Sequence, residues 1–212
     1  MKRVVLFFVI FFVGVMLFGN LREDYLKLIV METMEKQPKF ATDSINVRGV
    51  GRFPAFGYAY DVFVVDTLAY VCMGNNLVIL NISNKAAPKL LGYIDLPDYA
   101  EGVYVSGSYA YVADGYSGLR IINISNPSNP YEVSHYNTPE EIQDIYVSGS
   151  YAYVACRYFF YSSSLRIINI SNPKNPYQVG YYDTPGEAEG VYVSGSYIYL
   201  VYGSDGFYVL QQ

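Results

Sequence analysis

The stretch VYVSGSYAYVA, residues 103–113, decides the fold because the chain repeats it. It returns as IYVSGSYAYVA at residues 145–155 and as VYVSGSYIYLV at residues 191–201, and a more divergent copy, VFVVDTLAYVC, occupies residues 62–72. The steps between successive copies are 41, 42 and 46 residues. Self-similarity at a period of about 40 to 45 residues is a signature of propeller blades. The chain therefore contains four copies of one supersecondary unit.

Each copy contains four short apolar stretches separated by turn residues, which is the pattern of hairpin-connected strands. In the second copy we expect strands near residues 101–106, 109–113, 119–125 and 131–136. The turn at Ser106-Gly107-Ser108 uses the freedom of Gly107 to adopt positive φ. The strands are apolar or aromatic on both faces, so each sheet is expected to be covered on both sides. Radially packed, four-stranded antiparallel propeller blades provide this environment.

A second shared string, LRIINISNP, occurs at residues 119–127 and 165–173, with LVILNISNK at residues 77–85. Together with the strands above, it resembles the LVIVD repeat family of extracellular β-propeller proteins, over about residues 45–212. The resemblance implies a propeller fold and a surface or secreted setting, without a shared activity. The last residue of the family motif is Asp, whereas this chain carries Asn81, Asn123 and Asn169 there.

The two ends of the repeat region complement each other. The last copy stops after its third strand, at residues 206–212, and residues 45–53 align with the fourth strand of the other copies. We therefore expect an all-β, four-bladed propeller of four-stranded antiparallel blades, closed by an N-terminal strand that pairs beside residues 207–210. The alternative is a half-ring that dimerises into eight blades. The sequence favours the monomer.

The N-terminal residues precede the propeller and differ from it in character. Lys2 and Arg3 are followed by an apolar run over residues 4–18, a layout typical of an export segment. Residues 1–19 are expected to be a signal peptide or an uncleaved membrane anchor, and residues 20–44 a helical linker in which Pro38 ends the helical pattern. This predicts a secreted, periplasmic or cell-surface protein, with membrane contact only through an uncleaved N-terminal segment.

The cysteines and the charge each exclude a class of interaction. Cys72 and Cys156 align with Ala113 and Asp114 in non-adjacent copies, so we expect two free, buried thiols. The net charge is −5, from 14 basic and 19 acidic residues. No basic cluster exists beyond Lys2 and Arg3, so nucleic acid is not an expected partner.

Catalytic constellations are absent from the sequence. The one histidine, His135, occupies a fourth-strand position that carries Tyr93 and Tyr181 in other copies, and is expected to be structural. No Ser-His-Asp set, zinc site or phosphate loop can be assembled. The glycan-acceptor patterns at Asn81, Asn123 and Asn169 fall at the ends of three successive third strands, which explains them without glycans. The protein is therefore predicted not to be an enzyme.

Acidic residues gather in the connections between copies, PDYAEG, PEEIQD and PGEAEG. These connections emerge on the same side of a propeller as the loops between second and third strands. We expect carboxylates with few cations nearby, able to hold a cation such as calcium or to steer a basic partner, or else simply solvated. No other cofactor is expected. The acids concerned are Glu101, Glu140, Glu141, Asp144, Glu187 and Glu189, with Glu101, Glu189 and Asp144 as candidate metal ligands.

The loop after the second strand of the third copy is enlarged to CRYFFYS, residues 156–162. Consecutive aromatics beside an arginine match the residue types enriched at binding hot spots. The alternative is a lid over an apolar seam. The candidate partner-binding residues are Arg157, Tyr158, Phe159, Phe160 and Tyr161, together with Glu101, Glu187 and Glu189.

The sequence thus predicts an exported, non-enzymatic propeller that binds a protein or glycan at the cell surface or in the periplasm. Two alternatives remain. One is a hydrolase or lyase that uses the acidic channel mouth, and the other is a purely structural surface repeat protein.

Overall fold

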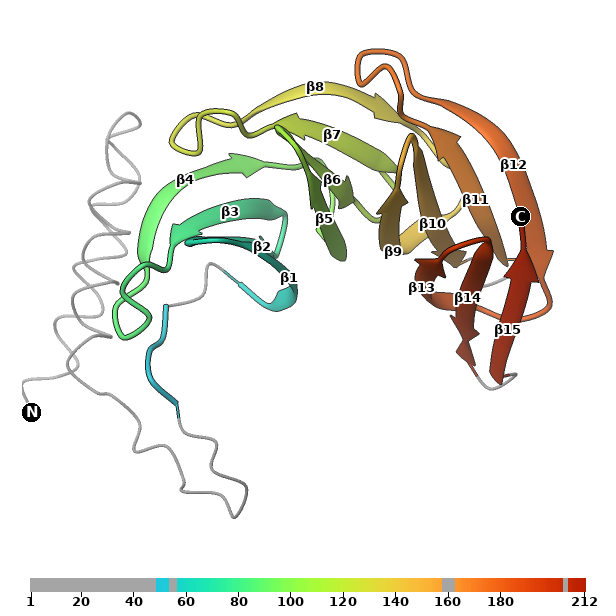
Figure 1. Ribbon diagram of the computed structural model, residues 1–212, viewed down its shortest axis with the longest axis horizontal. Helices are drawn as coiled ribbons and strands as arrows, with labels where there is room; N and C mark the ends of the chain where they lie inside the picture. The colour runs from blue at the N-terminus through green and yellow to red at the C-terminus, as the bar shows by residue number, and fades with distance from the viewer. Residues whose placement is uncertain (1–48, 54–56, 158–162, 204–205) are drawn as a thin grey trace, which may run out of the picture. The chain divides into compact units, whose positions relative to one another are not determined.

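The computed structural model describes residues 49–53, 57–157, 163–203 and 206–212 (Figure 1). The chain divides into two compact units, Met1–Pro54 and Ala55–Gln212. The second unit carries all the strands described below. The predicted export segment and linker helix lie outside the described residues. Within the described ranges, no helix has the length and apolar character needed to cross a membrane.

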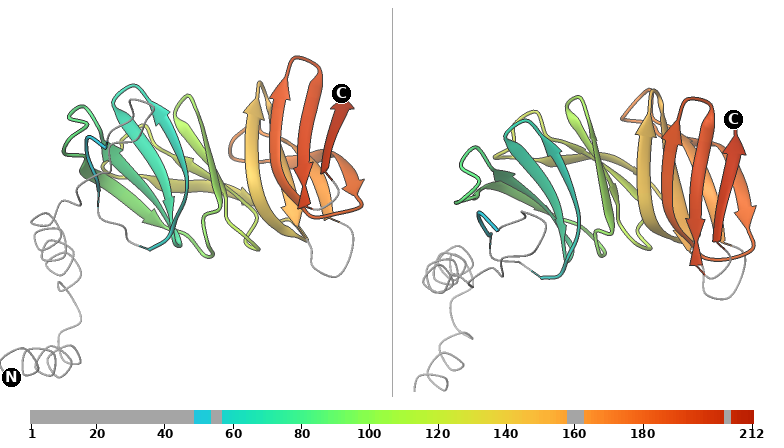
Figure 2. Two further views of the ribbon diagram at one scale, coloured as in Figure 1. Left: turned by 90° about the horizontal axis from the view of Figure 1, so that it is seen from below. Right: turned by 60° about the horizontal axis from the view of Figure 1, so that its bottom comes forward.

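The second unit is an all-β propeller of four antiparallel blades, as the sequence predicts (Figures 1 and 2). In each blade, strands that follow one another in sequence are neighbours in the sheet. Blade 1 contains β1 (Ala59–Val65), β2 (Leu68–Met73), β3 (Asn76–Asn81) and β4 (Lys89–Asp95); blade 2 contains β5 (Gly102–Ser106), β6 (Tyr109–Ala113), β7 (Leu119–Asn123) and β8 (Tyr131–Tyr136). Blade 3 contains β9 (Glu141–Ser148), β10 (Tyr151–Arg157), β11 (Ser163–Asn169) and β12 (Tyr177–Thr184); blade 4 contains β13 (Ala188–Ser194), β14 (Tyr197–Tyr202) and β15 (Gly206–Gln211).

The turns between first and second strands have the predicted backbone conformation. Gly107, Gly149 and Gly195 have φ of 59°, 57° and 60°, in the left-handed region that glycine adopts without a steric penalty. Blade 1 carries Asp66 at this position, with φ of 52°. Asp tolerates the left-handed region better than most side chains. The same turn therefore forms in all four blades.

The asparagines that end the third strands make the next turn. The Oδ1 atoms of Asn81, Asn123 and Asn169 accept hydrogen bonds from backbone N–H groups two residues later, at 2.9, 3.1 and 3.0 Å. This is the local bond by which Asn mimics a backbone turn. The predicted structural role of these residues is confirmed.

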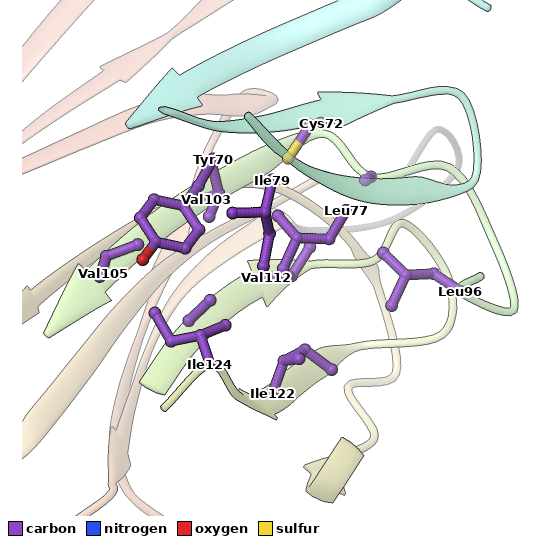
Figure 3. Close-up of a cluster of buried hydrophobic side chains, with 12 residues drawn as sticks. Tyr70, Cys72, Leu77, Ile79, Leu96, Val103, Val105, Val112, Ile122 and Ile124 are labelled. Atoms are coloured by element: carbon purple, nitrogen blue, oxygen red, sulfur yellow. The ribbon is translucent and has the colours of Figure 1, made fainter. Parts of the chain in front are cut away.

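Consecutive blades pack face to face through three hydrophobic clusters. In the first, Leu77 and Ile79 of blade 1 point toward Val112 and Ile122 of blade 2 (Figure 3). The second lies between blades 2 and 3, and the third between blades 3 and 4. The sheets of blades 2 and 3 are thus apolar on both faces because each has a neighbouring blade on both faces.

The two cysteines belong to different clusters. Cys72 lies between blades 1 and 2, and Cys156 between blades 2 and 3. Both are buried and free, which confirms the prediction. Burial raises the pKa of Cys72 well above its usual value and that of Cys156 to about 12, so neither thiol ionises near neutral pH.

An aromatic row runs across the innermost strands β1, β5, β9 and β13. One aromatic side chain per blade stands at the same strand position: Phe63, Tyr104, Tyr146 and Tyr192. Successive ring centroids lie 4.7, 5.0 and 4.8 Å apart, in tilted or edge-on geometry. Such pairs add to the free energy of area burial. We call these four side chains the aromatic row.

Two aspartates link neighbouring inner strands. Asp61 accepts a hydrogen bond from its own strand at Val62 N and from the next blade at Val103 N, at 2.7 and 2.8 Å. Asp144 does the same with Ile145 N and Val191 N, both at 2.8 Å. Each carboxylate therefore satisfies two backbone donors from two blades.

The fourth blade has three described strands, and among these β15 pairs only with β14. Residues 49–53, the described part of the expected closing strand, form no strand. Residues 45–48 lie outside the described residues. Closure by residues 45–53 therefore stays a prediction.

Candidate binding face

The connections between blades and the loops between second and third strands meet on one side of the propeller. Backbone hydrogen bonds join them: Ala100 N donates to Gly74 O at 2.9 Å, and Ile142 N donates to Gly115 O at 3.0 Å. Side chains add to this, because Asp98 Oδ2 accepts from Tyr116 N at 2.9 Å. We call this side the loop face. Its loops are held to one another across blade boundaries.

Two acids of the loop face form ion pairs with arginines from the same blade. Arg166 donates Nε to Glu140 Oε2 at 2.7 Å and Nη2 to Glu140 Oε1 at 2.5 Å, a two-point contact. Arg157 Nη2 lies 3.1 Å from Glu141 Oε2. Both glutamates are buried. The expectation of carboxylates with few cations nearby is therefore wrong here, because strands β10 and β11 direct arginines onto the connection that precedes β9.

A third pair involves an acid that the sequence analysis did not select. Asp114 is fully buried, and its Oδ2 lies 3.1 Å from Arg120 Nε. Burial raises the pKa of Asp114 to about 6, although the N–H of Asp98 and the Arg120 guanidinium act in the opposite direction. The available signal was the arginine of LRIIN, which recurs at 120 and 166 inside an otherwise apolar strand. A charged side chain at such a position requires a buried partner.

The remaining acids do not converge on one point. Asp144 is committed to two backbone N–H groups, and Glu189 is exposed. Glu101 and Glu187 are half-buried, and burial together with the charge of Glu141 raises the pKa of Glu101. In the part of the chain that the structure describes, no three His, Cys, Asp or Glu side chains are grouped so as to hold a metal ion. The structure thus does not assemble Glu101, Glu189 and Asp144 into a site.

The enlarged aromatic loop is described only at its start. Cys156 is buried in the cluster between blades 2 and 3, and Arg157 is paired with Glu141. Tyr158, Phe159, Phe160 and Tyr161 lie outside the described residues. Their predicted role in partner binding stays a prediction.

A tyrosine-lined recess lies on the loop face where blade 1 meets the connection to blade 2. Its volume is about 460 Å³. Tyr58 and Tyr99 are 82% and 56% exposed, and the ring of Tyr60 lies edge-on to Tyr99 with centroids 6.3 Å apart. Tyr99 belongs to the connection PDYAEG, in which only the acidic residues were predicted to be functional. The recess is lined by Gly57, Tyr58, Gly74, Asn75, Pro97, Asp98 and Tyr99.

His135 lies on the outer strand β8 and is connected through Glu132 to the pair of Arg120 and Asp114. Its side chain is 47% exposed, and Nδ1 lies 2.9 Å from Glu132 Oε1. Glu132 also contacts Arg120 Nη1 at 3.3 Å. The histidine is thus the exposed end of a chain of polar contacts on blade 2 that leads to the buried Arg120.

Two solved structures with a similar arrangement of strands are designed proteins. The computationally designed Ika4 protein matches with a TM-score of 0.63 and 8% identity, over 79% of this chain and 99% of that one. The computationally designed Ika8 protein matches with a TM-score of 0.60 and 7% identity, over 74% of this chain and 48% of that one. At these identities the likeness concerns the fold alone.

No curated protein matches the chain. A profile of the LVIVD repeat matches it four times, at residues 56–95, 97–138, 141–184 and 185–210. Each match spans one blade, from the preceding connection through the strands. Because the four matches together cover well over half of the sequence, the chain belongs to the LVIVD repeat family.

Proposed function

We propose that this LVIVD-repeat propeller is an exported, non-enzymatic binding module that presents its loop face to a protein or glycan at the cell surface or in the periplasm. The observation that carries the proposal is the tyrosine-lined recess. It combines a concave surface, exposed aromatic rings, and the polar side chains of Asn75 and Asp98. Ligand sites have this combination of apolar walls and a few placed polar groups.

The chemistry of tyrosine suits recognition at low entropic cost. A tyrosine ring presents a large contact area with two rotatable bonds, and its hydroxyl bonds to polar partners. Tyr58 and Tyr99 leave most of their surface to solvent, so both are accessible to a ligand. The same rings stack on sugars or contact a peptide, and the experiment below separates these two classes.

Preorganisation supports the same proposal. The connection that carries Pro97, Asp98 and Tyr99 is tied to blade 2, where Asp98 N donates to Asp114 Oδ1 at 3.2 Å. Tyr99 N donates to Asp98 Oδ1 at 2.8 Å. A loop held in this way loses little conformational entropy on binding, which improves affinity.

The roles of the loop-face acids favour binding over acid–base chemistry. Glu140, Glu141 and Asp114 each contact an arginine, and Asp144 accepts two backbone hydrogen bonds. Groups engaged in this way act as supports for the loops. This agrees with a module whose face has a fixed shape.

The test is binding of the purified full-length protein to a glycan array and to proteins of an envelope extract. A Tyr58→Ser/Tyr99→Ser variant is expected to lose the ligand that the wild type retains. The matched control is Tyr131→Ser/Tyr177→Ser, which removes two similarly exposed tyrosines on β8 and β12. Equal ligand retention by the recess variant and the wild type would refute the recess as the binding site.

Export is tested separately by fractionating the host cells and determining the N-terminal residue by mass spectrometry. We expect the protein in the envelope or the medium. Recovery in the cytoplasm with Met1 retained would contradict this part of the proposal.

A further inference from the structure

The four blades form three junctions. Of the two faces that would form a fourth, that of blade 4 is exposed and that of blade 1 is exposed along its inner strand β1. At each junction one blade contributes its forward face, turned toward the next blade, and the next contributes its rear face. The forward face of blade 4 and the rear face of blade 1 are left over, and we call them the end faces. Their residues are identified by aligning the repeats.

The end face of blade 4 is apolar and open to solvent. Val201, Phe207 and Val209 are 48%, 59% and 52% exposed. The corresponding residues of blade 2, Ala113, Leu119 and Ile121, are fully buried against blade 3. The same positions are thus core in one blade and surface in another.

The end face of blade 1 shows the same contrast along its inner strand. Val62 and Val64 are 55% and 53% exposed. The corresponding pairs of later blades are buried at a junction: Val103 and Val105, Ile145 and Val147, and Val191 and Val193. On the same face Ala69 and Val71 of β2 and Val78 and Leu80 of β3 are buried, so the exposed part of this end face is β1. Contiguous exposed apolar surface of this kind marks an interaction site.

The end faces also match in the residue that precedes the repeated valine or isoleucine of each inner strand. This position alternates along the chain as Asp61, Gly102, Asp144 and Gly190. At the junction of blades 2 and 3, a Cβ placed on Gly102 would lie 3.4 Å from Asp144 Cα, so a glycine faces an aspartate at close range. Blade 4 ends with Gly190 and blade 1 begins with Asp61. A junction from blade 4 to blade 1 would therefore repeat the pairing of blades 2 and 3.

The aromatic row points to the same continuation. Tyr104 and Tyr146 each lie between two aromatic neighbours, whereas Tyr192 and Phe63 stand at the two ends of the row. Tyr192 is 56% exposed. A blade 1 packed on blade 4 would place its Phe63 beside Tyr192, as Phe63 lies beside Tyr104.

We propose that the occupant of each end face is a second copy of this chain, with blade 4 of each copy packed on blade 1 of the other. The two new junctions are identical by twofold symmetry and continue the three interfaces already present. Head-to-tail contacts of this type close into a ring when the rotation permits. Two copies of four blades then form an eight-bladed ring. The sequence favours a closed monomer, but a closed monomer would bury Val62, Val64, Val201, Phe207 and Val209 between blades 4 and 1, whereas these side chains are exposed.

The proposal is tested by measuring the mass of the full-length protein by sedimentation equilibrium over a range of concentrations. We expect twice the mass of the 23.9 kDa chain, less any residues removed during export. Val201→Lys and Val62→Asp each place a charge in the new junction and should halve the measured mass. The residues that correspond to them, Ala113 and Ile145, lie in the same cluster between blades 2 and 3.

The double variant Val201→Lys/Val62→Asp restores charge complementarity and should recover the dimer. The matched control is Val179→Lys on the outer strand β12, where an equally exposed valine is outside both end faces. Circular dichroism shows whether each variant is folded. A wild type that is monomeric at all concentrations, or a dimer that Val201→Lys leaves intact, would overturn the proposal.

Discussion

Asp144 provides a quantitative test of how the blades are held together at their inner edge. Its carboxylate accepts hydrogen bonds from Ile145 N and Val191 N, both at 2.8 Å, and so links β9 of blade 3 to β13 of blade 4. Hydrogen bonds to a charged group contribute about 1.5 to 3 kcal/mol each. Burial raises the pKa of Asp144 even though both N–H groups act to lower it, so desolvation of the carboxylate outweighs the two hydrogen bonds in setting its protonation.

Replacing Asp144 with alanine removes both bonds and leaves two backbone donors without this acceptor. A buried donor left without an acceptor costs about 1 to 3 kcal/mol, so two of them, less the relief of the carboxylate's desolvation, give an expected loss of about 3 kcal/mol in the free energy of unfolding. Asp144→Asn retains one acceptor oxygen, so it should lose about half as much. Urea unfolding followed by tyrosine fluorescence measures both, because the chain has 25 Tyr and no Trp.

Two further variants make the comparison specific. Asp61→Ala removes the equivalent bridge between blades 1 and 2 and should cost a similar amount. Glu189→Ala removes an exposed acid of the same region and should stay within about 0.5 kcal/mol of the wild type. A loss below about 1 kcal/mol for Asp144→Ala would show that the bridge contributes little beyond its desolvation cost.

Three other predictions concern the turns, the buried acid and the thiols. Gly107→Ala should lower the free energy of unfolding by about 1 to 2 kcal/mol in urea, because Gly107 has a φ of 59°, which alanine adopts at a steric cost. No atom lies within 4 Å of the added Cβ, so the cost comes from the backbone conformation alone. An unchanged midpoint would contradict the positive φ. Asp114 has its pKa raised from 3.8 to about 6, so the folded state binds more protons than the unfolded state between these values. The contribution of Asp114 to the free energy of unfolding therefore falls as pH rises from about 4 to 6 and is constant above pH 6. Asp114→Asn should remove this pH dependence. A ¹³C titration of the Asp114 carboxyl group with its midpoint near 4 would refute the raised pKa. Cys72 and Cys156 should resist a thiol reagent at pH 8 in the native protein and react fully in denaturant, since both are buried with raised pKa values. Rapid labelling of the native protein would show that one of them is accessible.

The local features of the fold were predictable from the sequence because they depend on residues close together in the chain. The turn at Gly107 needs a residue that accepts positive φ, and the turn after Asn123 needs a short side chain that accepts a backbone hydrogen bond. Both recur in every complete copy, so the strand boundaries and the antiparallel pairing follow. The separation of Cys72 and Cys156 into different junctions also follows from the repeat.

The loop face was predicted less well. The sequence placed the acids on one side of the propeller, but not their partners. Arg166 and Glu140 are 26 residues apart in the sequence. Only the folding of blade 3 brings Arg166 Nε within 2.7 Å of Glu140 Oε2. The tyrosine recess also depends on distant segments, because Tyr58 and Tyr99 converge on the turn at Gly74 through the fold of blade 1.

The sequence by itself determined the number of blades, the strands within each blade and the turns that connect them. The physical reason is that each copy of the repeat encodes the same local conformation and the same pattern of apolar positions. The repeat does not encode what packs on each face of a blade. Val209 and Ile121 occupy the same position in the repeat and differ only in whether a neighbouring blade packs on them. Tertiary structure alone decided that Ile121 is buried and that Val209 is exposed. That difference depends on whether another blade packs on the face, which no residue of the repeat determines.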